Sequence, residues 1–294
     1  MKNQKHAIIF ALIAVFLWST VATAFKLALM QLKPIQLVFY ASLFSWLFLF
    51  VMLVFKGQHN QISSAFKNKP VMYLKLGVLN PFLYYLILFK AYELLPAQQA
   101  QALNYTWAIA LSVLAVPLLG QRLRKADLIA LSLTYLGVLI ISTKGQLTQL
   151  NFDSPLGVAL ALLSTLLWAL YWIFNTKNTD KPVVSLFICF SIGLPLIAAV
   201  ITWQNVWLLP TGKALFAAAY VGLFEMGITF VLWLMAMKKA ENTASVSNLI
   251  FISPFLSLVF IYTFLGEAIH PATLIGLGFI ITGLCVQKLV KSER

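Results

Sequence analysis

Long apolar stretches recur along almost the whole chain, and short polar breaks separate them. A helix needs about 20 mainly apolar residues to cross a bilayer core of roughly 30 Å. Ten stretches meet this requirement, at approximately 7–28, 34–55, 71–92, 96–119, 126–143, 155–175, 182–203, 213–237, 242–265 and 270–289. Runs such as Leu156–Leu170 are continuously apolar, whereas the strands of a membrane β-barrel would alternate in polarity. The pattern therefore predicts an all-α integral membrane protein with ten transmembrane helices.

Prolines stand where the predicted spans begin. Proline lacks a backbone N–H, and the first turn of a helix does not need that donor, so proline is well tolerated there. The prolines at or just before a predicted start are Pro34, Pro70, Pro96, Pro155, Pro182 and Pro271. They fix the expected start of each of these six spans to within a few residues.

The composition excludes a soluble globular protein. Apolar residues make up 61 % of the chain and charged residues 10 %, against roughly 45–50 % and about 25 % in soluble domains. So few charges cannot cover the surface of a water-soluble domain of this size. Cys189 and Cys285 both lie inside apolar runs, so they indicate nothing about the redox compartment.

The net charge of +13 is a topology signal. With ten spans and the N-terminus inside, the inner segments hold 15 of the 21 Lys and Arg residues, and the outer ends hold 5. Such a bias across short loops is the positive-inside signal, and it predicts that both termini are cytoplasmic. Nucleic-acid binding is the competing interpretation of a high net charge, but we find no soluble basic domain to carry it.

The two halves of the sequence resemble each other. Ala11–Thr20 matches Ala161–Leu170 at an offset of 150, which places Trp18 on Trp168. At an offset of 146, Gly120 falls on Gly266 and Gly137 on Gly283, without gaps. Because each half holds five spans, the second half enters the membrane from the opposite side. The sequence therefore predicts two inverted five-helix repeats, at 1–146 and 151–294, which is a transporter-type architecture.

The end of the chain carries a recognisable motif. The segment Ser253–Gly283 combines Pro254, the pair Gly266-Glu267, Gly276 and Gly283. It resembles the closing motif of the EamA-type repeat of the drug/metabolite transporter superfamily. In the first half, Ala108 stands in place of the proline and Gln121 in place of the glutamate.

That resemblance has implications for fold and activity. It implies ten helices in two inverted repeats, with a central cavity mainly between the first four helices of each half and the fifth and tenth helices at the periphery. It also implies export of amino acids and related metabolites, drugs or other small solutes, although some members import.

Glu225 is the acidic residue that topology does not explain. It lies in the middle of the eighth span, where a charged side chain costs about 2.5–3.5 kcal/mol on insertion scales. We interpret it as a substrate contact and as a proton-coupling group; a structural carboxyl that hydrogen-bonds between helices is the alternative. An offset of 145 places Glu225 on Asn80, which Pro81 follows in the third span. Both halves thus have a polar group at the same depth of the same helix.

Further substrate-binding candidates surround this pair. Thr229 and Trp233 follow Glu225 at i+4 and i+8, and Tyr84 follows Asn80 at i+4, which is one face of a regular helix. The other candidates are polar residues of the fourth and ninth spans and tryptophans well inside spans: Gln101, Tyr105, Asn248, Trp18, Trp107 and Trp168. Core packing is the alternative for the aromatic residues, interhelical hydrogen bonding for the amides, and a simple kink for Pro81.

These features favour a secondary active transporter that works by alternating access. We find no phosphate-binding Gly-rich lysine loop, so we do not expect ATP to be the direct energy source. Catalysis in a membrane-embedded enzyme usually needs clustered carboxylates on a metal or a nucleophile–base pair. A single intramembrane carboxyl supplies neither, so an enzyme is disfavoured. A channel would need a continuous polar pathway. His6, His59 and His270 have no second ligand at metal-binding spacing, and we expect no metal and no cofactor.

The predicted solute is small and amphipathic. One carboxyl among many aromatic residues suits amino acids, especially hydrophobic or aromatic ones, and cationic drug-like solutes are the alternative. The expected partners are this solute and the lipid bilayer, with no nucleic acid. Gly276, Gly278 and Gly283 permit close helix contact, of which a homodimer seam is one version. The expected location is a bacterial cytoplasmic (inner) membrane.

Overall fold

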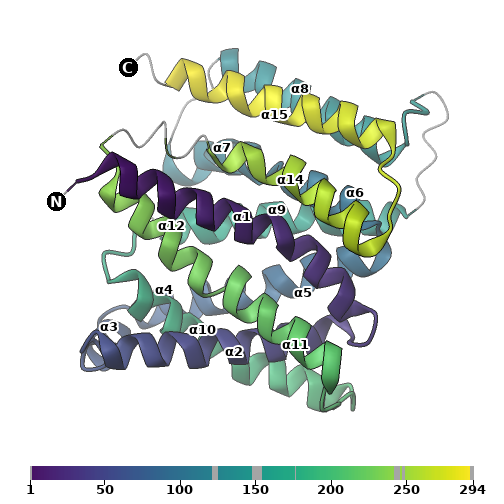
Figure 1. Ribbon diagram of the computed structural model, residues 1–294. Helices are drawn as coiled ribbons and strands as arrows, with labels where there is room; N and C mark the ends of the chain where they lie inside the picture. The colour runs from purple at the N-terminus through teal and green to yellow at the C-terminus, as the bar shows by residue number, and fades with distance from the viewer. Residues whose placement is uncertain are drawn as a thin grey trace. The chain divides into compact units, whose positions relative to one another are not determined.

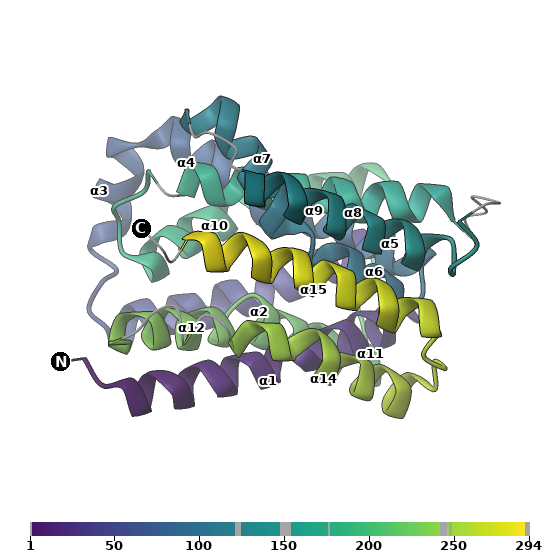
Figure 2. The same ribbon diagram turned by 90° about the horizontal axis from the view of Figure 1, so that it is seen from above.

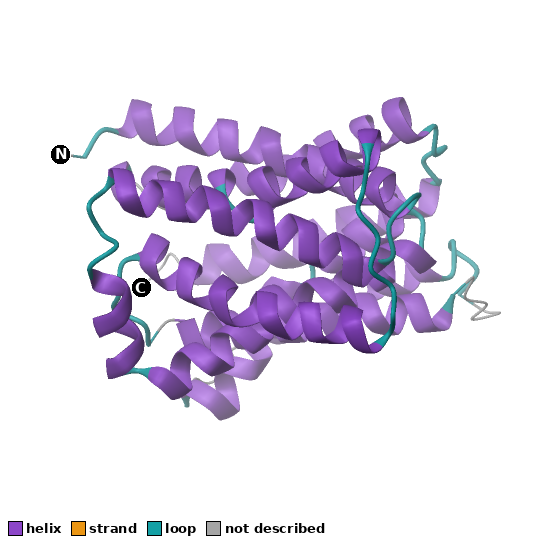
Figure 3. Cartoon of the chain, turned by 90° about the horizontal axis from the view of Figure 1, so that it is seen from below, coloured by secondary structure: helices purple, strands orange, loops and turns teal. Residues whose placement is uncertain are grey.

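The computed structural model describes residues 2–120, 125–147, 154–175, 177–241, 246 and 249–291. Every regular element within these ranges is a helix and none is a strand (Figure 3). Eight helices in them are long and apolar enough to cross a membrane, and two shorter apolar helices, Leu249–Leu265 and Pro271–Gln287, lie in the last two predicted spans. The all-helical, multi-span prediction is confirmed, and the exact number of transmembrane helices stays a prediction.

The helical elements follow the predicted spans, with several spans divided. In chain order they are α1 Gln4–Leu29, α2 Pro34–Phe55, α3 Gln61–Asn68, α4 Pro70–Gly77, η1 Val78–Leu83, α5 Tyr84–Leu94, α6 Ala97–Asn104, α7 Trp107–Leu119, α8 Lys125–Ser142, α9 Pro155–Asn175, α10 Pro182–Trp203, α11 Gly212–Tyr220, η2 Val221–Glu225, α12 Ile228–Lys239, η3 Leu249–Ile252, α14 Ser253–Phe260, η4 Ile261–Leu265 and α15 Pro271–Lys291. Five of the helices begin at a proline that the sequence placed at a span start, and Pro96 directly precedes α6.

Many large apolar side chains on these helices are exposed. They include Leu12, Phe16, Phe50, Leu128, Ile129, Leu163, Phe216 and Ile275. In water this much exposed apolar area would drive association. In a bilayer the same side chains contact acyl chains, so the surface is that of a membrane protein.

The helices form two compact units, which are described separately. Unit 1 holds Met1–Phe82 and Asp180–Gly266, and unit 2 holds Leu83–Thr179 and Glu267–Arg294. Each unit is built from segments of both halves of the sequence. A spatial division of this kind does not test a division along the sequence, so the two repeats at 1–146 and 151–294 stay a prediction.

In unit 1, α1 packs against α12, as Figures 1 and 2 both show, and also against α11 and α14. Ser19 on α1 donates a hydrogen bond of 3.2 Å to Ser253 on α14. The helices α2 and α10 also pack together, since the Trp46 indole N–H donates to Ser191 at 2.8 Å. These contacts join the first two helices of the chain to helices from its second half.

Two glycines of unit 1 allow helices to cross with their backbones close together. A Cβ on Gly77 of α4 would lie 2.9 Å from the Cys189 carbonyl oxygen of α10. A Cβ on Gly222 of η2 would meet the Ala41 carbonyl oxygen of α2 even more closely. Gly77 and Gly222 are 145 positions apart, and Ala41 and Cys189 are 148 apart. The third predicted span of each half therefore crosses the second predicted span of the other half at a glycine.

In unit 2, α8 and α15 lie side by side (Figure 1). A Cβ on Gly137 of α8 would collide with the Gly276 carbonyl oxygen, and one on Gly283 of α15 would lie 2.8 Å from the Ala130 carbonyl oxygen. Gly276 and Gly283, two of the glycines proposed from the sequence for a homodimer seam, thus pack against α8 of the same chain. A Cβ on the third, Gly278, would meet nothing within 4 Å.

The glycines that the repeat aligns at the short turns share one backbone conformation. Gly120 ends α7 with φ 68° and Gly266 ends η4 with φ 67°. This left-handed region is costly for residues with a side chain but open to glycine. The aligned Gly/Gly match therefore marks the same glycine conformation at two helix ends.

Candidate functional site

The eighth predicted span is interrupted at Glu225. The π-helical segment η2 ends at Glu225, Met226 and Gly227 form a turn, and α12 starts at Ile228. Gly227 has φ −118° and ψ −89°, which is outside the helical region. The Thr229 hydroxyl donates to the Phe224 carbonyl oxygen across the break. The interruption releases backbone polar groups from the helical ladder, and such groups are tolerated within a membrane only inside protein or in a water-filled cavity.

The third predicted span is interrupted at Asn80. Within η1, Asn80 has φ −139° and ψ 117°, an extended conformation, and the Asn80–Pro81 peptide bond is cis. Asn80 is 2 % exposed, and its Oδ1 has no hydrogen-bond partner among the described residues. Pro81 packs against α10, because a Cβ on Gly193 would lie 2.7 Å from Pro81 Cδ. A buried amide acceptor thus lies where the backbone leaves the helix.

The two breaks change one prediction. The spacing argument placed Thr229 and Trp233 on one helical face with Glu225, and Tyr84 on one face with Asn80. That argument assumed unbroken helices, and the turn at Met226–Gly227 and the extended Asn80 interrupt both. The candidate residues keep their proposed roles, but a shared helical face no longer supports them.

In unit 1, Trp18 of α1 lies against aromatic residues of α12. Its ring centroid is 5.5 Å from that of Trp233 and 5.7 Å from that of Phe230. Trp18 and Trp233 are both half-buried, whereas Thr229 is fully buried. Unit 1 therefore packs Trp18 on two aromatic residues of α12, the helix that follows the break at Glu225.

In unit 2, Trp168 of α9 stacks on Tyr84, the first residue of α5. The ring centroids are 4.4 Å apart with an interplanar angle of 23°, and the Tyr171 ring centroid lies 5.3 Å from that of Trp168. Trp168 and Tyr84 are both buried. The repeat aligns Trp18 with Trp168, and each tryptophan contacts the third helix of the other half.

The fourth predicted span is divided between α6 and α7. Gln101 is buried in α6, Tyr105 is half-buried in the turn between the helices, and Trp107 is half-buried at the start of α7. The next amide on this stripe, Asn104, donates to Ser164 at 3.4 Å, as the interhelical alternative expected. The break before Trp107 corresponds, 146 positions on, to the start of α14 at Ser253. Asn248 lies outside the described residues.

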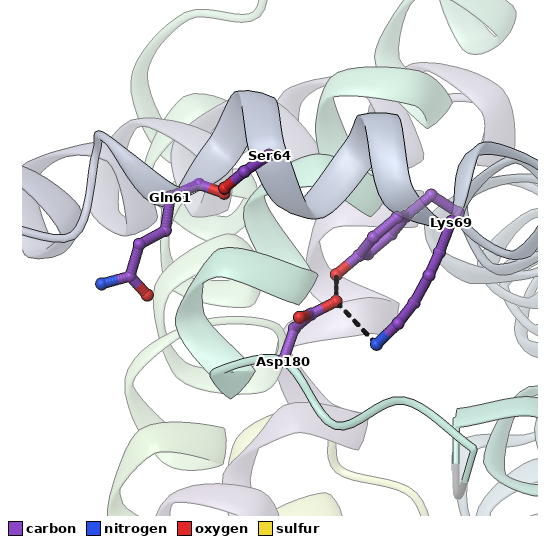
Figure 4. A network of polar contacts seen from close by, with 5 residues as sticks. Gln61, Ser64, Lys69 and Asp180 are labelled. Carbon is purple, nitrogen blue, oxygen red and sulfur yellow. Dashed lines mark hydrogen bonds and ion pairs between the residues drawn. The ribbon is translucent and has the colours of Figure 1, made fainter.

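One polar network was missed by the sequence-based prediction. Figure 4 shows Lys69 and a tyrosine, Tyr73, meeting one carboxylate oxygen of Asp180. The Tyr73 hydroxyl donates at 2.7 Å, and the Lys69 ammonium lies 3.3 Å away. Asp180 lies just before the start of α10. Lys69 and Tyr73 are four residues apart at the start of α4, but nothing in the sequence pairs them with Asp180.

Comparison with known proteins decides the family. Two successive segments, 5–143 and 155–287, match the EamA-like transporter family, and together they cover most of the chain. This chain belongs to the EamA-like transporter family. Family membership confirms the resemblance seen in the closing motif, and it identifies a multi-pass membrane transporter rather than an enzyme.

Individual relatives are distant. The chain is 25 % identical over 202 residues to a protein of Clostridium kluyveri that is named an uncharacterized transporter. The aligned residues cover 65 % of this chain and 63 % of that protein. It is 23 % identical to the aromatic amino acid exporter YddG of Ancylobacter novellus, over 73 % of this chain and 75 % of that one. A transporter of Archaeoglobus fulgidus is 25 % identical over 95 % of both chains.

A protein of known crystal structure has the same fold. It superposes on 98 % of this chain and 98 % of its own with a TM-score of 0.67, at 21 % identity. The likeness covers almost the entire length of both chains. At this identity it establishes the fold alone.

Proposed function

We propose that this chain is a secondary active exporter of small metabolites, in particular hydrophobic or aromatic amino acids, and that it works by alternating access. The observation that carries the proposal is the pair of helix breaks at Asn80 and Glu225. Transporters commonly bind their substrate near the midplane, at discontinuous helices in corresponding positions of two repeats. Asn80 and Glu225 meet that description, since an offset of 145 aligns them.

Ten transmembrane helices in two inverted repeats are part of the proposal. Two successive family matches support two repeats. The crossings at Gly77 and Gly222 also support them, because a two-fold axis would exchange the first crossing with the second. The packing of Trp18 on α12 and of Trp168 on α5 follows the same exchange. An inverted arrangement supplies two states of similar energy, one open to each side.

The roles of the individual residues follow from their chemistry. Glu225 binds the substrate ammonium group or carries the coupling proton, and the Asn80 amide hydrogen-bonds the substrate. Aromatic faces for an apolar side chain are offered in unit 1 by Trp18 and Trp233, and in unit 2 by Trp168, Tyr84 and Tyr105. The other candidates for substrate contact are Gln101, Trp107, Thr229 and Asn248. The name of the Ancylobacter novellus relative supports an aromatic amino acid as the solute.

Orientation and location come from the charges. The excess of Lys and Arg in the segments at one face supports cytoplasmic termini. A bacterial inner membrane fits bacterial relatives such as those of Clostridium kluyveri and Ancylobacter novellus. A homodimer remains part of the proposal, although Gly276 and Gly283 are used for packing within the chain.

Counterflow in proteoliposomes tests the proposed function. Vesicles preloaded with unlabelled tryptophan should accumulate labelled tryptophan transiently, because a carrier exchanges solute and a channel does not. Ethidium in place of tryptophan tests the alternative of a cationic drug-like solute, which the half-buried Glu225 and the half-buried Trp18–Trp233 pair also suit. Equilibration without overshoot for both solutes would contradict a carrier of either kind.

A further inference from the structure

A pocket lies within unit 2, away from both helix breaks in the sequence. Its volume is about 270 Å³, and it lies where α6 and α15 begin and α8 has ended. The lining residues that matter here are Pro96, Gln99, Ile141, Lys144, Glu267 and Ala268. The charge distribution predicts that these helix ends are at the outer face.

Gln98 holds the wall of this pocket in place. Its side-chain oxygen accepts hydrogen bonds of 2.9 Å from the His270 backbone N–H and from the Thr273 hydroxyl. Its side-chain N–H donates to the Ala268 carbonyl oxygen at 2.9 Å. These three bonds tie the loop before α15 to the start of α6, so the pocket is built into the fold.

Two residues that line the pocket each have a buried acceptor atom without a donor in the described part of the chain. Glu267 Oε1 accepts from the Ala97 backbone N–H at 3.1 Å, where it caps α6, but Oε2 is buried without a partner in the described part of the chain. Gln99 donates to the Ile141 carbonyl oxygen at 3.3 Å, and its own Oε1 is likewise buried and unpaired. A buried unsatisfied acceptor costs about 1–3 kcal/mol, and more when charged. The pocket therefore favours a ligand that donates several hydrogen bonds.

Charges of both signs line the same pocket. An ammonium group carries three N–H donors and a positive charge, which suits the Glu267 carboxylate and the Gln99 amide oxygen together. Lys144 contributes a positive charge suited to a carboxylate. Pro96, Ile141 and Ala268 supply apolar surface for a small side chain.

We propose that this pocket is a second binding site, which takes a small zwitterionic amino acid. The ligand ammonium contacts Glu267 Oε2 and Gln99 Oε1, and its carboxylate contacts Lys144. The site depends on neither Asn80 nor Glu225. It rests on the lining chemistry, and it stands whether or not the protein transports the same solute.

The test uses the purified full chain in lipid nanodiscs and three probes: glycine, methylammonium and acetate. Binding is followed by the shift in the thermal unfolding midpoint during titration. Glycine should bind at least about ten-fold more tightly than either probe of single charge, which corresponds to about 1.4 kcal/mol.

Glu267→Gln keeps an acceptor for the Ala97 N–H and should weaken glycine binding about ten-fold or more. Lys144→Asn, which tolerates the positive φ of 51° at this position, should weaken glycine but not methylammonium.

Two control variants separate this pocket from the helix breaks. Glu93→Gln removes another carboxylate of a predicted outer end and should bind glycine as the wild type does. Glu225→Gln removes the carboxylate at the break, and it reports any glycine that binds there instead of in the pocket. Wild-type glycine affinity in both Glu267→Gln and Lys144→Asn, or no glycine binding to the wild type, would mean that water alone fills the pocket and would overturn the proposal. Loss in Glu225→Gln alone would overturn it too, while leaving the proposed function standing. Glycine binding without tryptophan counterflow would refute the proposed function, but the proposal of a second binding site would stand.

Discussion

Asn80 and Glu225 are 145 positions apart, and each lies where a long apolar helix loses its regular backbone. Asn80 is extended within η1, and Glu225 is the last residue of η2 before a two-residue turn. Neither polar side chain would be expected inside an unbroken membrane helix. We propose that the two breaks correspond in the two predicted repeats and that the solute binds there.

Replacing Asn80 with alanine separates a functional role from a structural one. Because Asn80 Oδ1 has no hydrogen-bond partner within the described ranges, its removal should cost less than about 1 kcal/mol of stability. Transport should fall about ten-fold, as expected for one lost hydrogen bond to the solute. Thermal unfolding and initial uptake rates are measured on the same preparations. A large loss of stability with unchanged transport would show that the amide is structural.

The close crossing at Gly222 predicts a steric effect. A Cβ at this position would meet the Ala41 carbonyl oxygen and lie 2.9 Å from Phe44 Cβ, so Gly222→Ala should cost about 1–3 kcal/mol. Gly278→Ala is the matched control, because a Cβ there meets nothing within 4 Å, and it should be neutral or stabilising by up to about 1 kcal/mol. The unfolding midpoint in detergent compares them. Equal midpoints for the two variants would contradict the crossing.

The network at Asp180 predicts an unequal contribution of its two partners. Tyr73 is fully buried and donates to the carboxylate at 2.7 Å, so Tyr73→Phe should cost about 1.5–3 kcal/mol. The Lys69–Asp180 ion pair is partly exposed, and Lys69→Met should cost only about 0–1 kcal/mol. A double-mutant cycle with Asp180→Asn measures both couplings. A larger coupling for Lys69 than for Tyr73 would reverse this assignment.

The positions of many helices in this protein can be predicted from the sequence. The bilayer thickness sets how long an apolar helix must be to span it, and proline favours the first turn of a helix. Thus α2 and α10 begin at Pro34 and Pro182, as predicted. The matched turns were also visible, since Gly120 and Gly266 are the residues best suited to the left-handed conformation found there.

The breaks within spans were harder to predict. Pro81 indicated a distortion after Asn80, but hydropathy averages over such a break and the eighth span carries no proline near Glu225. Contacts between distant segments could not be predicted either. Nothing in the sequence near Asp180 indicates Tyr73, and nothing near Glu267 indicates the N-terminus of α6. These contacts depend on which helices pack together, and the order of apolar runs does not specify that.

A direct role of Glu225 in transport, as substrate contact or as carrier of the coupling proton, is the central claim, and the pH dependence of tryptophan counterflow tests it most directly. Wild type, Glu225→Gln and the control Glu93→Gln are reconstituted at equal protein density and assayed across a range of pH. The account predicts that Glu225→Gln expresses and folds normally but loses transport or its pH dependence, while Glu93→Gln behaves as the wild type. Full transport by Glu225→Gln with an unchanged pH profile would contradict the claim.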